Sequence, residues 1–181
     1  MDPLASAMET AVVVHVPEAE PAVGEHRRRF DVAASWGVRA HVSVLYPFLP
    51  PHDVDDDALR RLGTALSQVT AFECTFARCA WFDDDVLWLA PEPSTPFREL
   101  TAAVWQEFPE HPPYEGAFDD VVPHLTVAER SRGSLDQLRD VERTVSRALP
   151  VRTYVDRVAL IAGRPEADSW RTVHELSLPT G

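Results

Sequence analysis

The sequence predicts an α+β fold, built as one domain with two lobes. Segments with strand patterns alternate with segments with helix patterns, and the order of elements in the first half recurs, without its first strand, in the second half. A length of 181 residues fits one domain, and 45% hydrophobic with 25% charged residues is typical of a globular protein. We expect a single domain of residues 10–181, with lobe halves of roughly 10–90 and 91–178, after a flexible tail of residues 1–9.

The first half opens with a strand, a helix and a second strand. Residues 10–16 (TAVVVHV) are rich in β-branched side chains, which favour a strand. Residues 24–35 are mostly polar with spaced apolar positions, which indicates a helix. Residues 39–46 (RAHVSVLY) alternate in polarity, as a half-buried strand does, and the prolines from Pro47 onward end the regular structure.

A helix and a hairpin complete the first half. The acidic run 53–57 suits the start of a helix that extends to about Gln68, because negative charge stabilises a helix N-terminus. Residues 72–82 alternate and predict a strand, and residues 86–90 form its hairpin partner across a turn at 83–85.

The second half begins with a helix, a long loop and a strand. Residues 97–108 carry apolar side chains at a helical period. Residues 109–120 (PEHPPYEGAFDD) form a proline-rich loop, and loops of this length within a domain are often functional. Residues 121–128 predict the next strand.

The chain ends with an amphipathic helix and two strands. Residues 134–149 place leucines and valines on one helix face, and Ser134 can cap its N-terminus. Residues 151–162 and 170–178 form the last pair of strands around a turn.

The charge balance limits the possible partners. The chain has 29 acidic and 17 basic residues, a net charge of −12, and every basic residue is arginine. The absence of lysine excludes a Schiff-base or P-loop lysine. The acidic balance argues against a partner such as long nucleic acid, which is bound through a basic surface, but it leaves room for a small anion in a local pocket.

The remaining composition indicates a cytoplasmic protein, which we expect to be a monomer. Cys74 and Cys79 have no zinc-site spacing and are expected to be small core residues in a reducing compartment. The N-terminus lacks the pattern of a signal peptide, and no apolar run approaches the roughly 20 residues needed to cross a membrane.

One short pattern occurs twice. His41-Val42-Ser43-Val44 lies in the second predicted strand of the first half, and His124-Leu125-Thr126-Val127 lies in the matching strand of the second half. Residues i and i+2 of a strand point to the same face. His41 therefore projects with Ser43, and His124 projects with Thr126. If the halves are related by a pseudo-two-fold axis, these four side chains meet in one cleft.

Two imidazoles and two hydroxyls in one cleft suit the cleavage of a phosphodiester. In-line displacement needs a base on the attacking oxygen and an acid on the leaving oxygen, which lie on opposite sides of phosphorus. Histidines can do both at neutral pH, and hydroxyls can donate to the non-bridging oxygens. This chemistry needs no metal or other cofactor.

The segments AHVSVLYPF (40–48) and VPHLTVAE (122–129) resemble the two-histidine (2H) phosphoesterase superfamily, which includes bacterial 2′-5′ RNA ligase-like proteins and cyclic nucleotide phosphodiesterases. The resemblance covers residues 10–178. It implies a bilobal, pseudo-symmetric fold, with two antiparallel-rich sheets lining a central cleft and helices outside. It also implies that His41 and His124 are the acid/base pair and that Ser43 and Thr126 bind phosphate. Neither the pattern nor the resemblance says which histidine is the acid.

Several neighbours of these segments are candidates for substrate binding. Arg39 and Arg130 share strand parity with the two histidines and could clamp a phosphate, or they could be solvated charges at strand ends. Tyr46 and Phe48 follow the first segment, and Phe48 is the preferred contact for a nucleobase or the rim of the site. Other expectations are His15 in the cleft if its strand lies beside His41, Trp36 and Trp105 in the core, and Arg27–Arg29 on a solvated helix face.

We therefore expect a metal-independent phosphodiesterase. Its substrate would be a small 2′,3′-cyclic phosphate nucleotide or a 2′-5′-linked nucleotide or short RNA end, with no membrane partner. The alternative is a non-catalytic binder of RNA ends or small phosphorylated ligands. A metal site formed by His15, His41 and His124 is conceivable, but no His-x-His or nearby carboxylate spacing supports it.

Overall fold

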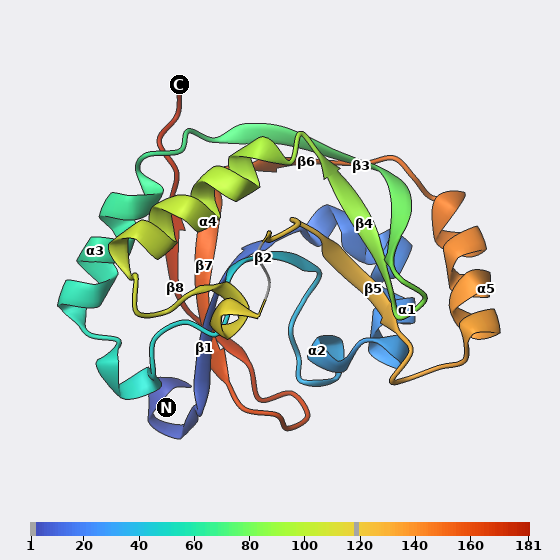
Figure 1. Cartoon of the computed structure of the whole chain (residues 1–181), viewed down its shortest axis with the longest axis horizontal. Coiled ribbons are helices and arrows are strands. Elements are labelled where there is room, and N and C mark those ends of the chain that lie inside the picture. The colour runs from blue at the N-terminus through green and yellow to red at the C-terminus, as the bar shows by residue number, and fades with distance from the viewer. Residues whose placement is uncertain (1–2, 118–119) are drawn as a thin grey trace.

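The computed structural model describes residues 3–117 and 120–181, which fold into two antiparallel four-stranded sheets flanked by helices (Figure 1). The strands are β1 (Glu9–His15), β2 (His41–Leu45), β3 (Phe72–Phe82), β4 (Val86–Glu92), β5 (Leu125–Glu129), β6 (Val151–Val155), β7 (Arg157–Gly163) and β8 (Arg171–Ser177). The first sheet has the order β2-β1-β7-β8, and the second has the order β5-β4-β3-β6. The predicted α+β class and paired antiparallel sheets are confirmed.

The helices are α1 (Glu20–Phe30), α2 (Val32–Ser35), α3 (Asp56–Leu66), α4 (Thr95–Glu107) and α5 (Leu135–Ser146), with short 3-10 turns η1 (Pro3–Ser6), η2 (Pro17–Ala19), η3 (Pro51–Asp53) and η4 (Pro113–Gly116). Within the predicted tail 1–9, η1 is followed by a hydrogen bond from Met8 N to Gly163 O, and β1 begins at Glu9. In the described part of the chain, no helix is long and apolar enough to span a membrane.

The two sheets do not coincide with the predicted sequence halves 10–90 and 91–178. The first sheet joins β1 and β2 to the C-terminal β7 and β8, whereas β3 to β6 form the second sheet. The single strand predicted at 151–162 is in fact two strands that separate at Asp156 and enter different sheets. β6 is an edge strand with alternating burial, while β7 is central and almost wholly buried, and no glycine or proline marks the boundary between them.

The pseudo-symmetry lies instead in the placement of the two histidine-bearing strands. β2 and β5 are both edge strands, and each pairs with one antiparallel neighbour, β1 or β4. Helix α1, from the segment between β1 and β2, packs against β5, and helix α4, from the segment between β4 and β5, packs against β2. This reciprocal packing brings the two edge strands toward each other across the centre of the molecule (Figure 1).

Local sequence explains the helix boundaries. The predicted helix 24–35 begins earlier, at Glu20, because Pro21 fits a first helical turn. It also divides at Asp31, which has extended backbone angles and caps α2 by accepting from Ala33 N. In α5, Ser134 and Gln137 form a reciprocal capping box, as the cap prediction anticipated.

The core lies between the helices and the sheets, and a smaller apolar cluster lies under the cleft. The small cluster contains Val13, Val38, Ile161 and Trp170, with Trp36 packed against it. Trp105 is 44% exposed, so its predicted core position was wrong. Its helix α4 buries a narrow stripe at Phe97, Leu100, Thr101, Ala103 and Val104, and Trp105 lies outside it.

Candidate active site

All four residues of the two His-x-Ser/Thr segments line one cavity of about 220 Å³. His41 begins β2, and Ser43 follows on the same face. His124 lies one residue before β5, and Thr126 is the second residue of that strand. The structure therefore brings together His41, Ser43, His124 and Thr126, although they come from different sheets.

The two imidazole rings are oriented by matching hydrogen bonds. His41 Nδ1 lies 2.8 Å from Arg39 O, and His124 Nδ1 lies 2.8 Å from Val122 O. A carbonyl oxygen can only accept, so each Nδ1 carries the proton. Each Nε2 is then the nitrogen that can take a proton from, or return one to, a bound molecule.

The electrostatic surroundings of the two histidines differ. Burial and the nearby Arg27 guanidinium lower the pKa of His41 to about 3. Burial also lowers the pKa of His124, but its hydrogen bond to Val122 and the carboxylate of Asp31 oppose that effect. Both rings are therefore neutral at pH 7, and a positive charge is less costly on His124 than on His41.

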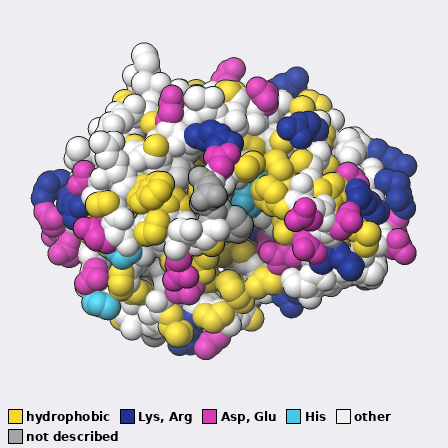
Figure 2. Space-filling view, in the orientation of Figure 1, with side chains coloured by type: hydrophobic (Ala, Val, Ile, Leu, Met, Phe, Trp, Pro, Cys, Tyr) yellow, Lys and Arg dark blue, Asp and Glu magenta, His cyan; other side chains and the backbone are white. Residues whose placement is uncertain are grey.

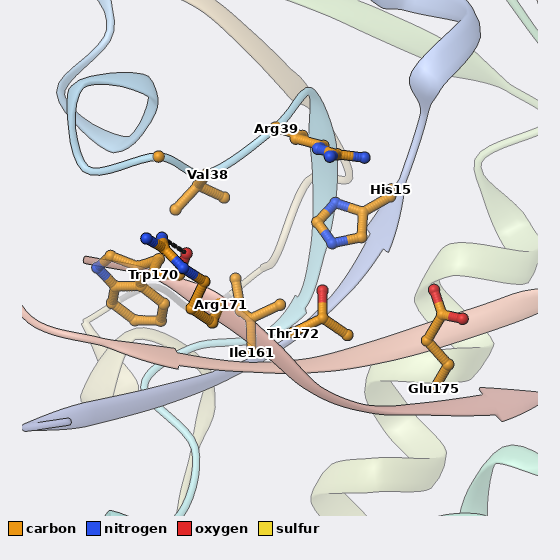
Figure 3. A pocket seen from close by; sticks show the side chains of 9 residues that line it. His15, Val38, Arg39, Ile161, Trp170, Arg171, Thr172 and Glu175 are labelled. Carbon is orange, nitrogen blue, oxygen red and sulfur yellow. Dashed lines mark hydrogen bonds between the residues drawn. The ribbon is translucent and has the colours of Figure 1, made fainter. Parts of the chain in front are cut away.

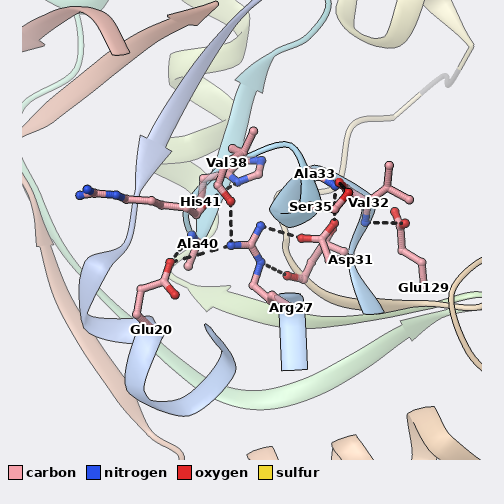
Figure 4. Close-up of polar contacts among 12 residues, drawn as sticks. Glu20, Arg27, Asp31, Val32, Ala33, Ser35, Val38, Ala40, His41 and Glu129 are labelled. Atoms are coloured by element: carbon pink, nitrogen blue, oxygen red, sulfur yellow. Dashed lines mark hydrogen bonds and ion pairs between the residues drawn. The ribbon is translucent and has the colours of Figure 1, made fainter. Parts of the chain in front are cut away.

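Arg27 connects the two histidine segments from beneath. Its guanidinium is 2% exposed, pairs with Asp31 at 2.6 Å, and donates from Nε to Thr126 O at 3.1 Å and from Nη1 to Val38 O at 3.2 Å (Figure 4). Glu20 completes the network by accepting from Ala40 N at 2.6 Å. One side chain thus fixes the backbone of β5 relative to the segment that leads into β2.

The long loop contributes Tyr114 to the cleft. Its backbone N–H donates to Tyr46 O at 2.7 Å, and its side chain is hydrogen-bonded to that of Ser43. Tyr114 and Glu115 both have left-handed backbone angles, with φ of 50° and 55°, which non-glycine residues adopt at a cost. The docking of the loop keeps Tyr114 and Glu115 in these strained conformations. Tyr114 therefore positions the hydroxyl of Ser43.

Aromatic side chains form much of the remaining wall. Trp36, Tyr46, Tyr114 and Trp170 line the cavity. On the other side, the Phe82 ring meets His124 edge-on at 5.0 Å and stacks on Trp88 at 4.7 Å. These rings form an apolar wall beside the two partly exposed imidazoles.

The sequence matches the model of a known protein family over most of its length. The family model of the 2′-5′ RNA ligase superfamily matches residues 15–165, which is most of the chain. The chain belongs to the 2′-5′ RNA ligase superfamily. Comparison with curated proteins finds no significant sequence match.

Solved structures share the superfamily fold with this chain. TT0787 of Thermus thermophilus matches with a TM-score of 0.65 and 18% identity over 96% of this chain and 99% of that one. Escherichia coli LigT complexed with NADP+ matches with a TM-score of 0.59 and 15% identity over 97% and 99%. Another LigT structure, complexed with 3′-AMP, has a TM-score of 0.58 and 15% identity over 96% and 99%. At these identities the likeness shows the fold alone.

Within this superfamily fold, three of the predicted contacts are placed differently. Phe48 is 4% exposed and its ring packs on Phe108, so it is a core residue and not the rim of the site. Arg130 follows the end of β5 and donates to Gly133 O in the next turn, so it does not share the face of His124. Arg39 precedes β2 and lines a neighbouring cavity instead. Tyr46 does line the cleft, and its hydroxyl donates to Glu9 at 2.8 Å.

Arg27, Asp31 and Glu129 were missed as site residues. Arg27 was expected on a solvated face, yet Val23, Arg27 and Phe30 are all buried at the i, i+4, i+7 spacing of one helix face. That spacing, with Asp31 four residues after Arg27, was the available signal. Glu129 lines the cleft, and burial followed by the charge of Asp31 raises its pKa.

His15 lies directly opposite His41 across the β1–β2 ladder, so the condition for its expected place in the cleft is met, but His15 lines the neighbouring cavity instead. In the described part of the chain, no group of three His, Cys, Asp or Glu side chains has the geometry to hold a metal ion.

Proposed function

We propose that the protein is a phosphodiesterase that acts on a small 2′,3′-cyclic phosphate or 2′-5′-linked nucleotide or RNA end, with His41 and His124 as its acid/base pair and no metal. The supporting observation is the pair of imidazoles, each held through Nδ1 by a carbonyl, in a cavity that also contains two hydroxyls. The LigT structures with 3′-AMP and with phosphate agree with ligands of this class.

We assign His41 as the base and His124 as the acid. Arg27 disfavours a proton on His41, whereas Asp31 favours one on His124. A bound phosphate is anionic and raises both pKa values, so His124 can be protonated in the complex while His41 stays neutral.

With this assignment, hydrolysis of a 2′,3′-cyclic phosphate takes place in one displacement at phosphorus. A water oxygen attacks phosphorus while His41 Nε2 takes its proton. The bond from phosphorus to one ribose oxygen breaks, and His124 Nε2–H protonates that oxygen to give a phosphomonoester. Ser43 and Thr126 donate to the non-bridging oxygens, where charge accumulates. Exchange of protons with solvent restores the starting forms.

Alanine variants of the two histidines test the proposal. H41A and H124A should each lower kcat for 2′,3′-cyclic AMP by at least about 100-fold, the usual worth of a positioned acid or base. H174A is the matched control, because His174 lies exposed on β8 outside the cleft. Treatment with EDTA should leave the rate unchanged.

The same assay separates the alternatives. Retained hydrolysis in both H41A and H124A would refute the acid/base assignment. Saturable nucleotide binding without product in the unmodified protein would show a non-catalytic binder of phosphorylated ends.

A further inference from the structure

A second cavity, of about 370 Å³, adjoins the cleft on the face of the first sheet that carries the histidines (Figure 3). It shares Val38, Ile161 and Trp170 with the cleft, so the two cavities are neighbours. The proposed chemistry uses none of the polar groups in this second cavity.

The second cavity starts one strand away from the proposed base. His15, which lines it, is the cross-strand partner of His41. Directly opposed residues in an antiparallel ladder have Cα atoms about 4.5–5.5 Å apart and side chains on the same face. A substrate held at His41 can therefore extend over His15 without crossing a barrier of main chain.

Two arginines give this cavity a positive character. Figure 3 shows Arg171 beside Trp170 on one side of the cavity, and Arg39 with His15 on the other. In the described part of the chain, neither guanidinium pairs with a carboxylate; Arg171 Nη1 donates to Trp170 O at 2.8 Å. Glu175 also lines the cavity, but its carboxylate lies 3.6 Å from Arg157. These two guanidinium groups give the cavity a local positive charge within a chain of net charge −12.

Neutral hydrogen-bonding groups complete the cavity. The side chain of Thr172 points toward His15 (Figure 3). His15 Nδ1 is buried and has no hydrogen-bond partner among the described residues, although buried polar atoms are normally paired. A ligand with several oxygen atoms would satisfy these groups together with the guanidinium N–H donors, which suit phosphate geometry.

We propose that this second cavity is a phosphate subsite, in which Arg39, Arg171 and Thr172 bind a second phosphate group of the substrate. The inference rests on the proposed phosphodiesterase function and narrows its substrate class. The preferred substrate carries a phosphate on the 5′ side of the nucleoside that bears the scissile cyclic phosphate, as in a 5′-phosphorylated nucleotide or the end of a short RNA.

Paired substrates test the subsite. Adenosine 2′,3′-cyclic phosphate and the same compound with a 5′-phosphate differ only in the second phosphate. The unmodified protein should have a KM about tenfold lower for the 5′-phosphorylated compound, since charge-assisted bonds to phosphate are the strong ones. R39Q and R171Q should each reduce this ratio at least threefold, and R171K should recover part of it. R152Q, which removes an exposed arginine from the second sheet, should leave the ratio unchanged.

Binding measurements distinguish failure of the subsite from failure of the proposed function. If neither compound is hydrolysed, the proposed function fails, but the ratio of their dissociation constants by calorimetry still tests the subsite. Equal affinity for the two compounds, or a ratio that R39Q and R171Q do not change, would overturn it. Activation of the unphosphorylated substrate by free inorganic phosphate, lost in R171Q, would instead show a site for a separate anion and would also overturn it.

Discussion

At the scale of single residues, Arg27 is the side chain whose role is most sharply defined by the structure. It is buried with Asp31 and donates to backbone on both histidine-bearing segments. Removing one member of a buried ion pair leaves an uncompensated charge, which typically costs about 3–5 kcal/mol. R27M and D31N should each lower the free energy of unfolding by about this amount, measured by chemical denaturation.

The double variant R27M/D31N tests whether the loss in each single variant comes from the buried charge that is left without its partner. It should lose much less stability than the sum of the two single variants, because no buried charge is left unpaired. Additive losses would show that Arg27 acts through its backbone contacts alone.

The neutral state of His41 predicts a dependence of stability on pH. Its pKa is about 3 in the folded protein against 6.5 for the free side chain, so between these values the unfolded chain binds a proton that the folded chain does not. This contribution to stability is present above pH 6.5 and is lost as the pH falls toward 3. The slope can reach about 1.4 kcal/mol per pH unit.

H41N should therefore flatten the fall in the free energy of unfolding between pH 6.5 and pH 4, relative to the unmodified protein. H174N, at an exposed position on β8, is the control and should not. An unchanged slope in H41N would contradict a depressed pKa at His41.

At the scale of elements, the sequence predicted most strands and helices because their patterns are local. The alternation in β2 and β3 and the caps of α3 and α5 depend on neighbours within a few residues. The break at Asp156 was not predictable in this way, because it depends on pairing with distant strands: β6 pairs with β3, and β7 pairs with β1. The same holds for Phe48, whose burial depends on Phe108, sixty residues later.

In the candidate site, too, local patterns predicted some of the residues, and contacts between distant segments decided the others. The duplicated His-x-Ser/Thr pattern placed four cavity residues correctly, because strand parity decides which side chains share a face. Tyr114 reaches the cleft through the docking of a loop, and its position does not follow from a local period.

The cap of α5 gives a prediction at this scale. Ser134 accepts from Gln137 N while the Gln137 side chain accepts from Ser134 N. S134A should lower the free energy of unfolding by about 1 kcal/mol, within the usual range for a lost cap. Because α5 contributes no residue to the cleft, kcat should not change; a fall in kcat would show that α5 supports the site.

At the scale of the whole molecule, the net charge of −12 favours small nucleotide substrates over large nucleic acids. A surface that released many counterions on binding would need clustered basic residues, but acidic residues outnumber basic ones, and several arginines pair with carboxylates, as at Arg61–Glu107 and Arg139–Asp84. Figure 2 shows basic and acidic side chains interspersed on the face that it presents. The local positive charge beside the cleft comes from Arg39 and Arg171.

This distribution predicts how salt affects binding. A cyclic nucleotide contacts at most a few arginines, so its dissociation constant should rise less than about tenfold between 50 and 200 mM salt, far below the roughly 10³–10⁵-fold loss expected for 6–10 phosphate contacts. Folded tRNA should bind weakly at either salt concentration, because the acidic surface outside the cleft repels its backbone. Tight tRNA binding with a steep salt slope would contradict this, since it would require a basic surface that extends well beyond the two arginines.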